Sequence, residues 1–310
     1  MRIAFLGNFL VDYTSETHHA KSLGELGHQV TCLQETIAYP DAIAAAAAES
    51  DLFIWVHTHG WHTPEIETAL ADAINRNIPV ITYHLDLWKG LGREADMATD
   101  PYWRVLTDFF TCDMRMADYL TEHTSVKGHY LPPGVFGQEC YMAEPTVPFD
   151  VAFVGSYQYH PEWPYRGQLV EWLRETYGDR FRHYGGGGLP TVRGAELNQV
   201  YANARVSVGD TLCLGFDYPH YWSDRLFETA GRGGFQIFPR IEGITDYLTE
   251  DKEVVLYSYG DFDELKHKID YYLSHDSERE AIRRAGFDRT CAEHTYVHRW
   301  KHILETLNFT

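Results

Sequence analysis

Histidine and carboxylate side chains are grouped at a few points of this 310-residue sequence, and each group is a candidate for acid–base chemistry. His84 and Asp86 stand two residues apart, directly after the apolar run 78–83. Because imidazole titrates near neutral pH, such a pair in a loop after a strand can exchange protons or bind a substrate hydroxyl. The alternative is a structural histidine beside a helix-capping aspartate. We interpret His84 and Asp86 as catalytic candidates, with Arg93 and Glu94 near enough in sequence to join them.

His57, His59 and His62 form a second cluster at the end of another apolar run. A His-x-His pair at a strand end resembles the metal-binding pair of barrel-type hydrolases, so one alternative is a metal-dependent hydrolase in which His84 completes the site. The Lys, His and Asp that such barrels need do not follow at the required spacing, and a chain with 17 histidines forms clusters easily. We therefore expect no metal ion, and expect Trp61 to be a stacking surface for a sugar or an acceptor.

A third group of polar residues follows the first apolar run. Asn8, Glu16 and His18 lie in the connection after residues 2–6 or in the first turn of the next helix. Since ligands bind at the carboxyl ends of parallel strands, we expect these three residues, with His19 as an alternative to His18, to contact an acceptor. The alternative is a capped helix with solvated side chains. Gly7 lacks the further glycines of a dinucleotide-binding fingerprint, which disfavours NAD.

In the C-terminal half, Arg225 and Glu228 are one helical turn apart and precede the glycine-containing run 229–234. A guanidinium near a helix start suits a diphosphate, and a carboxylate accepts both hydroxyls of a ribose. The same spacing also describes an ordinary ion pair on a helix. The four glycines 185–188 lack the Gly-Lys-Ser/Thr of a P-loop and predict a close approach of backbone to a ligand or another loop.

Short apolar runs alternate with helix-length amphipathic segments along the whole chain, and these elements must position the candidate residues. Such alternation predicts parallel sheets with helices on both faces. We expect strands in the first half at 2–6, 29–33, 51–56, 78–83, 109–112 and 129–131. We expect strands in the second half at 150–154, 181–184, 205–208, 234–238 and 253–257, with a helical end broken near 294–296.

A segment rich in Pro and Gly, 131–148, interrupts the alternation and is the best candidate for a linker. We therefore predict two Rossmann-like α/β domains, at 1–140 and 146–295, that face each other across a ligand cleft. The C-terminal helix, 296–310, is expected to pack back on the N-terminal domain.

The charge balance limits the partners of the protein. There are 45 acidic and 26 basic side chains, a net charge of -19, and residues 1–145 alone carry 20 acidic and 8 basic ones, a balance of -12. Non-specific binding to a polyphosphate backbone is therefore disfavoured. Five scattered cysteines without a CxxC pair predict a reduced, cytoplasmic setting, and no apolar run is long enough to span a bilayer.

The segment 223–234, continued by Glu242-Gly243-Ile244, resembles the donor-site motif of group-1 glycosyltransferases with the GT-B fold. That motif usually reads Glu-x7-Glu, and in the CgeB-like (spore maturation protein-like) branch it typically contains Arg-x-Phe-Glu, as at 225–228 here. Further similar segments are found at 26–30, 78–84, 252–255 and 285–299. One departure is plain: the first Glu of the spacing falls on His220.

The resemblance implies a retaining, metal-independent transferase that uses a nucleotide-diphosphate sugar, with a UDP-sugar as the first expectation. Glu228 would bind the ribose hydroxyls, and Arg225 or Arg166 would neutralise the diphosphate. Gly155 and Asp210, each at the end of an expected central strand, would lie beside the donor.

By the same resemblance, His84 would touch the transferred sugar, and the departing phosphate would accept the proton of the acceptor hydroxyl. The acceptor could be a glycan, a metabolite, a protein or a hydroxymethylated DNA base, since relatives of this branch occur in phage-like settings. A non-catalytic sugar-binding protein of the same fold is the remaining alternative.

Overall fold

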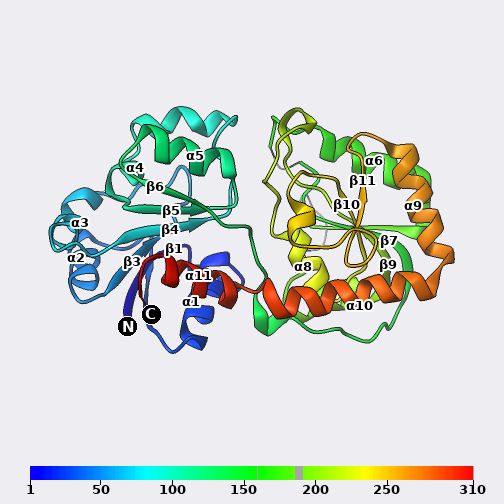
Figure 1. Ribbon diagram of the computed structural model, residues 1–310, viewed down its shortest axis with the longest axis horizontal. Coiled ribbons are helices and arrows are strands. Elements are labelled where there is room, and N and C mark those ends of the chain that lie inside the picture. The colour runs from blue at the N-terminus through cyan, green and yellow to red at the C-terminus, as the bar shows by residue number, and fades with distance from the viewer. Residues whose placement is uncertain (159, 186–190, 310) are drawn as a thin grey trace. The chain divides into compact units, whose positions relative to one another are not determined.

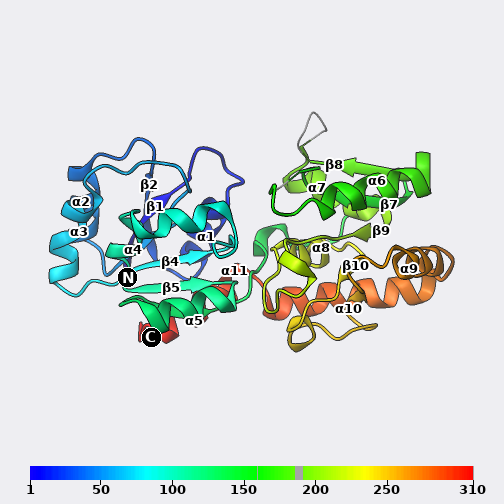
Figure 2. The ribbon, with the colours of Figure 1, turned by 90° about the horizontal axis from the view of Figure 1, so that it is seen from above.

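The computed structural model describes residues 1–158, 160–185 and 191–309, and it divides into two compact units. One unit consists of Met1–Pro132 together with Tyr296–Thr310, and the other of Pro133–Thr295. Each unit contains one parallel sheet with helices packed around it (Figures 1 and 2). Residues 186–188 of the glycine run lie outside the described residues, so the prediction for that run has no counterpart here.

The sheet of the N-terminal unit has the strand order β2-β1-β3-β4-β5-β6, and every neighbouring pair is parallel. Its inner strands are buried along nearly their whole length, because helices cover both faces of a parallel sheet. The strands are β1 (Arg2–Gly7), β2 (Gln29–Gln34), β3 (Leu52–Trp55), β4 (Val80–His84), β5 (Asp108–Thr111) and β6 (Lys127–Tyr130).

The first helix of this unit starts at a side-chain cap. Thr14 caps α1 (Ser15–Glu25), and its hydroxyl accepts a hydrogen bond from the backbone N–H of Thr17 over 3.2 Å. The C-terminal helix α11 (Tyr296–Thr306) packs against α1, and Figure 1 shows the two side by side. The other helices are α2 (Pro40–Ala48), α3 (Ile66–Asn75), the 3-10 helix η1 (Gly92–Ala98), α4 (Tyr102–Val105) and α5 (Met114–His123).

The second unit repeats the scheme with the strand order β11-β10-β9-β7-β8, again all parallel. The strands are β7 (Phe149–Val154), β8 (Phe181–Tyr184), β9 (Ala204–Val208), β10 (Gln236–Pro239) and β11 (Val255–Tyr257). The helices are α6 (Tyr165–Tyr177), α7 (Gly194–Asn203), α8 (Arg225–Gly231), α9 (Phe262–Ser274) and α10 (Asp276–Glu293).

Each sheet has a point where the order of the strands reverses. In the N-terminal unit the chain leaves β1 for β2 on one side and returns to β3 on the other side. In the second unit β7 is flanked in the same way by β8 and β9. In each sheet, the connections that follow the strands at this point diverge. The crevice between these connections is where open α/β sheets bind ligands.

The predicted alternation of strands and helices is confirmed, including the break between α10 and α11. Two helices occupy a stretch for which the sequence analysis predicted none. These are α4, of a single turn, and α5, which buries Met116, Ala117 and Leu120. No helix among the described residues is long and apolar enough to cross a membrane.

Candidate functional site

A pocket of about 310 Å³ lies at the strand-order reversal of the N-terminal unit, where the connections after β1, β3 and β4 meet. Of the predicted residues, His84 and Asp86 from the end of β4 and Glu16 from the first turn of α1 line it. The full lining comprises Ser15, Glu16, His19, Val56, His57, Thr58, His59, Tyr83, His84, Leu85, Asp86 and Arg93. The structure therefore brings together side chains that are far apart in the sequence.

Glu16 is buried beneath the end of β1. A Cβ atom added at Gly7 would lie 2.9 Å from Cγ of Glu16, so this approach of helix to strand requires a glycine. Burial raises the pKa of Glu16 to about 7, although the backbone N–H groups of Glu16 and Asn8 stabilise its charged form. The negative charge of Asp86 adds to the rise. A carboxyl group that titrates near neutral pH is suited to proton transfer.

His84 and Asp86 contact each other through the main chain. The backbone N–H of Asp86 donates to Nδ1 of His84 over 3.2 Å, and Nε2 of His84 lies 3.3 Å from the carbonyl oxygen of His57. Burial lowers the pKa of His84, so the ring is neutral, with its proton on Nε2. The Asp86 carboxylate is 47% exposed and lies 3.6 Å from Nη1 of Arg93. Asp86 therefore presents an oxygen acceptor to the pocket.

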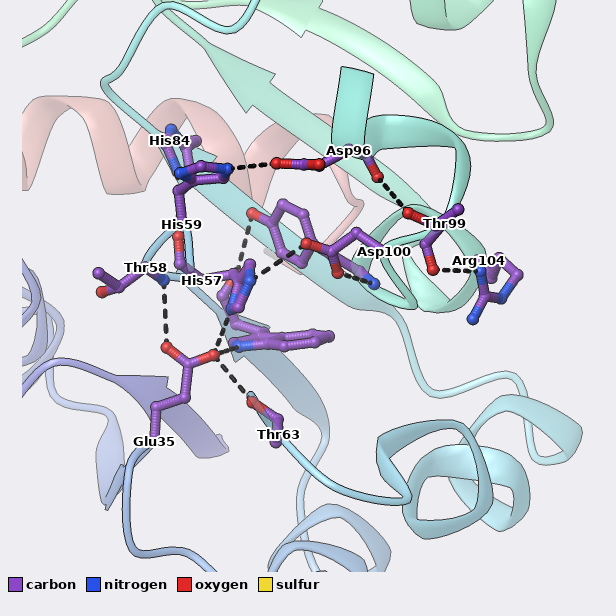
Figure 3. A network of polar contacts seen from close by, with 12 residues as sticks. Glu35, His57, Thr58, His59, Thr63, His84, Asp96, Thr99, Asp100 and Arg104 are labelled. Carbon is purple, nitrogen blue, oxygen red and sulfur yellow. Dashed lines mark hydrogen bonds and ion pairs between the residues drawn. The ribbon is translucent and has the colours of Figure 1, made fainter. Parts of the chain in front are cut away.

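A buried network fixes the wall of this pocket after β3 (Figure 3). Nδ1 of His57 pairs with Glu35, and Nε2 of His57 lies 3.3 Å from Oδ2 of Asp100. Burial lowers the pKa of His57, but the hydrogen bonds with Asp100 and Glu35 outweigh it and raise the pKa to about 9. The Glu35 carboxylate also accepts hydrogen bonds from Trp55, Thr58 and Thr63. A charged imidazole is thus held between two carboxylates.

Sequence reasoning missed Glu35 and Asp100. Glu35 follows β2 directly, as the predicted candidates follow β1, β3 and β4, and this shared position at a strand end was the available signal. Asp100 stands in an irregular segment between η1 and α4, where the sequence offers no comparable signal.

The histidines of the metal-site alternative make separate contacts. His57 is held by the network above, His59 lies 2.7 Å from Oδ2 of Asp96, and His62 is exposed. Within the described ranges, no group of three or more His, Cys, Asp or Glu side chains is arranged to hold a metal ion. The geometry of these residues gives no support to a metal-dependent hydrolase.

Three of the predicted acceptor contacts lie outside the lining of the pocket among the described residues. Asn8 contributes its backbone N–H to Glu16, while its side-chain oxygen accepts from Leu10 over 3.3 Å. His18 is half-buried on α1, and the lining residue is its neighbour, His19. Trp61 is half-buried in the connection between β3 and α3. His19, the alternative to His18, lies one helical turn after Glu16 and lines the pocket with it.

In the second unit, Arg166 and Asp210 form a buried ion pair at the strand-order reversal. Nε of Arg166 donates to Oδ2 of Asp210 over 2.7 Å, and the carboxylate has no exposed surface. Trp163 and Tyr259 donate to the same carboxylate over 3.2 Å each. Burial raises the pKa of Asp210, whereas Arg166, Trp163 and Tyr259 all act against this rise. Two predicted donor-site residues are therefore partners of each other.

Two glycines lie beside the Arg166–Asp210 ion pair, where a larger side chain would approach its neighbours closely. A Cβ atom at Gly209, directly before Asp210, would lie 2.3 Å from Cδ2 of Phe238. Gly155 follows β7, and a Cβ atom there would lie 3.9 Å from Nη1 of Arg166. Trp163 also lines a pocket of about 760 Å³ on the connection between β7 and α6. The remaining lining of that pocket is Tyr157, Gln158, His160, Pro161, Pro164, Gly167, Gln168 and Glu171.

Arg225 and Glu228 pair with each other on α8, as the ion-pair alternative also anticipated. Glu228 has a second cation beside it, because Nε of Arg232 lies 3.4 Å from Oε1 of Glu228. Nη1 of Arg225 also donates to the hydroxyl of Tyr201 over 3.4 Å. The side chains of Arg225 and Glu228 retain 22% and 19% exposure, respectively. A partly exposed carboxylate between two guanidinium groups is thus available to a ligand.

His220, which stands where the resembled motif has its first Glu, has a left-handed backbone with φ of 51°. Its backbone N–H donates to the carbonyl oxygen of Glu242 over 2.9 Å. Its ring lies over Gly243, where an added Cβ atom would lie only 2.3 Å from Nδ1 of His220. The imidazole therefore packs against the Glu-Gly-Ile segment of the motif.

Residues 166–305 match a family model described as glycosyl transferase-like. An alpha-glucosyltransferase in complex with UDP-glucose and DNA containing an abasic site aligns with a TM-score of 0.73 and 11% identity over 99% of each chain. Anabaena HepE in complex with UDP-glucose aligns with a TM-score of 0.66 and 13% identity over 100% of each chain. No curated protein matches the sequence.

Sucrose-phosphate synthase from Thermosynechococcus elongatus aligns with a TM-score of 0.58 and 12% identity, over 99% of this chain and 98% of that chain. At these identities the likeness shows the fold, which is GT-B as predicted. The family match supports a transferase.

Proposed function

We propose that the protein is a glycosyltransferase that moves a sugar from a nucleotide-diphosphate sugar to an acceptor hydroxyl. The observation that carries this proposal is the position of Arg225 and Glu228, which lie within the residues 166–305 matched by the glycosyl transferase-like family model. Both are partly exposed on one face of α8, beside Arg232. Membership of the CgeB-like branch is part of the same proposal and rests on the sequence resemblance alone.

In this proposal Glu228 accepts hydrogen bonds from the two ribose hydroxyls of the donor. The flanking guanidinium groups of Arg225 and Arg232 orient the carboxylate. In the same proposal Arg225 neutralises part of the charge of the diphosphate.

Arg166 stabilises the charge that develops on the departing diphosphate. Its attachment to Asp210 through Nε fixes the guanidinium before the reaction, and such preorganised charges lower the barrier. Gly155 keeps the space beside Nη1 of Arg166 free of a side chain. Asp210 therefore has a positioning role.

The N-terminal pocket handles the hydroxyl groups in this scheme. His84 contacts the transferred sugar, and Asp86 and Glu16 accept hydrogen bonds from hydroxyls. The sequence resemblance implies a reaction that proceeds with retention and without a metal ion. In that reaction the departing phosphate takes the acceptor proton, so the protein need not supply a base. The protein then contributes orientation and electrostatic stabilisation.

UDP-glucose is the first donor to test, because two of the aligned structures are complexes with UDP-glucose.

For the acceptor, one candidate is DNA that carries a hydroxymethylated base, since one of those complexes also contains DNA. The balance of -12 in residues 1–145, from 20 acidic and 8 basic side chains, favours an uncharged acceptor instead. Transfer of labelled glucose to hydroxymethylated DNA, with unmodified DNA as the control, decides between the two acceptors.

The donor assignment is tested by thermal unfolding with UDP and UDP-glucose. A ligand that binds only the folded chain, present at 100 times its Kd, adds about 2.7 kcal/mol of stability. We expect Glu228→Ala to lose this stabilisation, and the matched change Glu175→Ala, at an exposed position of α6, to keep it. Equal stabilisation of both variants would contradict the donor site.

A further inference from the structure

His19 lines the N-terminal pocket and is packed against the C-terminal helix. Its ring, 1% exposed, lies among three aromatic rings. The ring centroids are 5.1 Å from Tyr83 of β4, and 4.2 Å and 5.7 Å from Tyr296 and Trp300 of α11. His19 therefore has little freedom to rotate, and its two nitrogens face defined surroundings.

The contact with Trp300 fixes the proton of His19. The indole Nε1–H can only donate, and it lies 3.1 Å from Nδ1 of His19. Nδ1 must then be the acceptor and carry no proton. Burial lowers the pKa of His19 to about 3, so the ring is neutral at physiological pH. The single proton is thus on Nε2, and Trp300 selects this tautomer.

Within the described part of the chain, Nε2 of His19 is buried and has no hydrogen-bond partner. Buried N–H groups in folded proteins nearly always have a partner, because an unpaired donor has lost its hydrogen bond to water. His19 also lines the 310 Å³ pocket. A ligand oxygen in that pocket is therefore the partner that this N–H lacks.

The other charges of the lining define the chemical class of the ligand. The carboxylate of Asp86, and that of Glu16 when it is ionised, repel an anion, so a phosphate group is disfavoured. The cationic groups are already engaged, since Arg93 lies 3.6 Å from Asp86 and His57 pairs with Glu35. A hydroxyl group can donate to a carboxylate and accept from an N–H at the same time.

We propose that the N-terminal pocket binds an uncharged, hydroxyl-bearing group, such as a sugar ring, and that Nε2–H of His19 donates a hydrogen bond to one of its oxygens. Trp300, 281 positions away in the sequence, is a positioning residue that keeps the proton on Nε2. This inference rests on the proposed function, because the group is either the sugar of the donor or part of the acceptor.

The tautomer and the contact are tested together by long-range ¹H–¹⁵N NMR of the imidazole groups in the full chain. We expect a spectrum of the Nε2–H tautomer for His19, and a shift of that proton when UDP-glucose or D-glucose is added. A response to UDP-glucose without one to D-glucose or UDP identifies the sugar of the donor. A response to D-glucose alone identifies an acceptor. Protonation at Nδ1, or no response to either compound, would overturn the inference.

Two substitutions at the same position separate the ligand contact from packing. His19→Asn keeps an acceptor near the position of Nδ1 but removes the distal donor, whereas His19→Gln places an amide N–H near the position of Nε2. We expect His19→Asn to weaken binding of the responding sugar compound about tenfold and His19→Gln to recover most of it. Trp300→Phe should produce a mixture of the two tautomers. Equal affinities for the two His19 variants would count against a role for Nε2–H.

The outcome is independent of the donor-site experiment. If UDP-glucose stabilises the chain through Glu228 while the His19 proton does not respond, the inference fails and the proposed function stands. If D-glucose shifts the His19 proton but no nucleotide compound stabilises the chain, the pocket assignment stands and the proposed function fails.

Discussion

The strand-order reversals of the two units have the same topology but carry different chemistry. At the N-terminal reversal, Glu16 has a pKa of about 7, His84 is neutral, and a buried N–H of His19 has no partner among the described residues. At the reversal of the second unit, Arg166 and Asp210 neutralise each other. The parallel-sheet scaffold creates the crevice in both cases, and the connecting segments decide what the crevice can do.

This difference agrees with a division of labour between the units. Groups that titrate near neutral pH, or that lack a partner, are suited to sugar hydroxyls and protons. Paired charges held in place by Trp163 and Tyr259 are suited to a nucleotide, whose diphosphate carries a fixed negative charge.

The largest effect on stability is expected in the second unit. Asp210→Ala leaves the buried guanidinium of Arg166 without its counter-ion, and removing one partner of a buried pair costs about 3–5 kcal/mol. Urea unfolding followed by circular dichroism measures this loss. Asp179→Ala, at an exposed position in the same unit, should change the unfolding free energy little. A loss below about 1 kcal/mol for Asp210→Ala would mean that the pair does not hold this crevice together.

A pH-dependent effect is expected in the N-terminal unit. Folding raises the pKa of Glu16 from 4.5 to about 7, so between these values the folded state binds more protons than the unfolded state. The wild type therefore loses unfolding free energy as the pH rises through this window, up to about 3 kcal/mol. The side chain introduced by Glu16→Gln does not titrate. The unfolding free energy of this variant, measured relative to that of the wild type, should therefore increase by up to about 3 kcal/mol as the pH rises through this window.

Urea unfolding at pH 4 and pH 8 compares the two proteins, with Glu25→Gln at the exposed end of α1 as the control. A difference between wild type and Glu16→Gln that is independent of pH would show that folding does not raise the pKa of Glu16.

Much of the fold followed from the sequence, because continuous apolar runs of four to six residues separated by amphipathic segments have few other structural solutions. Helix α5 was missed since its apolar residues, Met116, Ala117 and Leu120, are few and lie among charged neighbours. The strands observed at 108–111 and 127–130 were predicted at 109–112 and 129–131. The predicted ends differ from the observed ones by at most two positions, as is usual for boundaries predicted from a local pattern.

Three residues named from the sequence, His84, Asp86 and Glu16, line one pocket, because each stands at the end of a strand or in the segment that follows it. The sequence did not reveal which residues become partners. The pairs His57–Glu35 and His19–Trp300 are 22 and 281 positions apart and meet only through the strand order and the return of α11. Arg166 and Asp210 were both named as donor-site residues, yet nothing in the local pattern showed that they bind each other.

The most direct test of the account measures UDP release from UDP-glucose and UDP affinity in the same three proteins: wild type, Glu228→Ala and Asp86→Asn. We predict that the wild type releases UDP and that Glu228→Ala loses UDP binding. Asp86→Asn should bind UDP with wild-type affinity but turn over at least about tenfold more slowly, because the neutral amide is a weaker acceptor for a substrate hydroxyl than the carboxylate. Wild-type turnover by Asp86→Asn, wild-type UDP affinity of Glu228→Ala, or no UDP release by the wild type would contradict the division of labour between the two units.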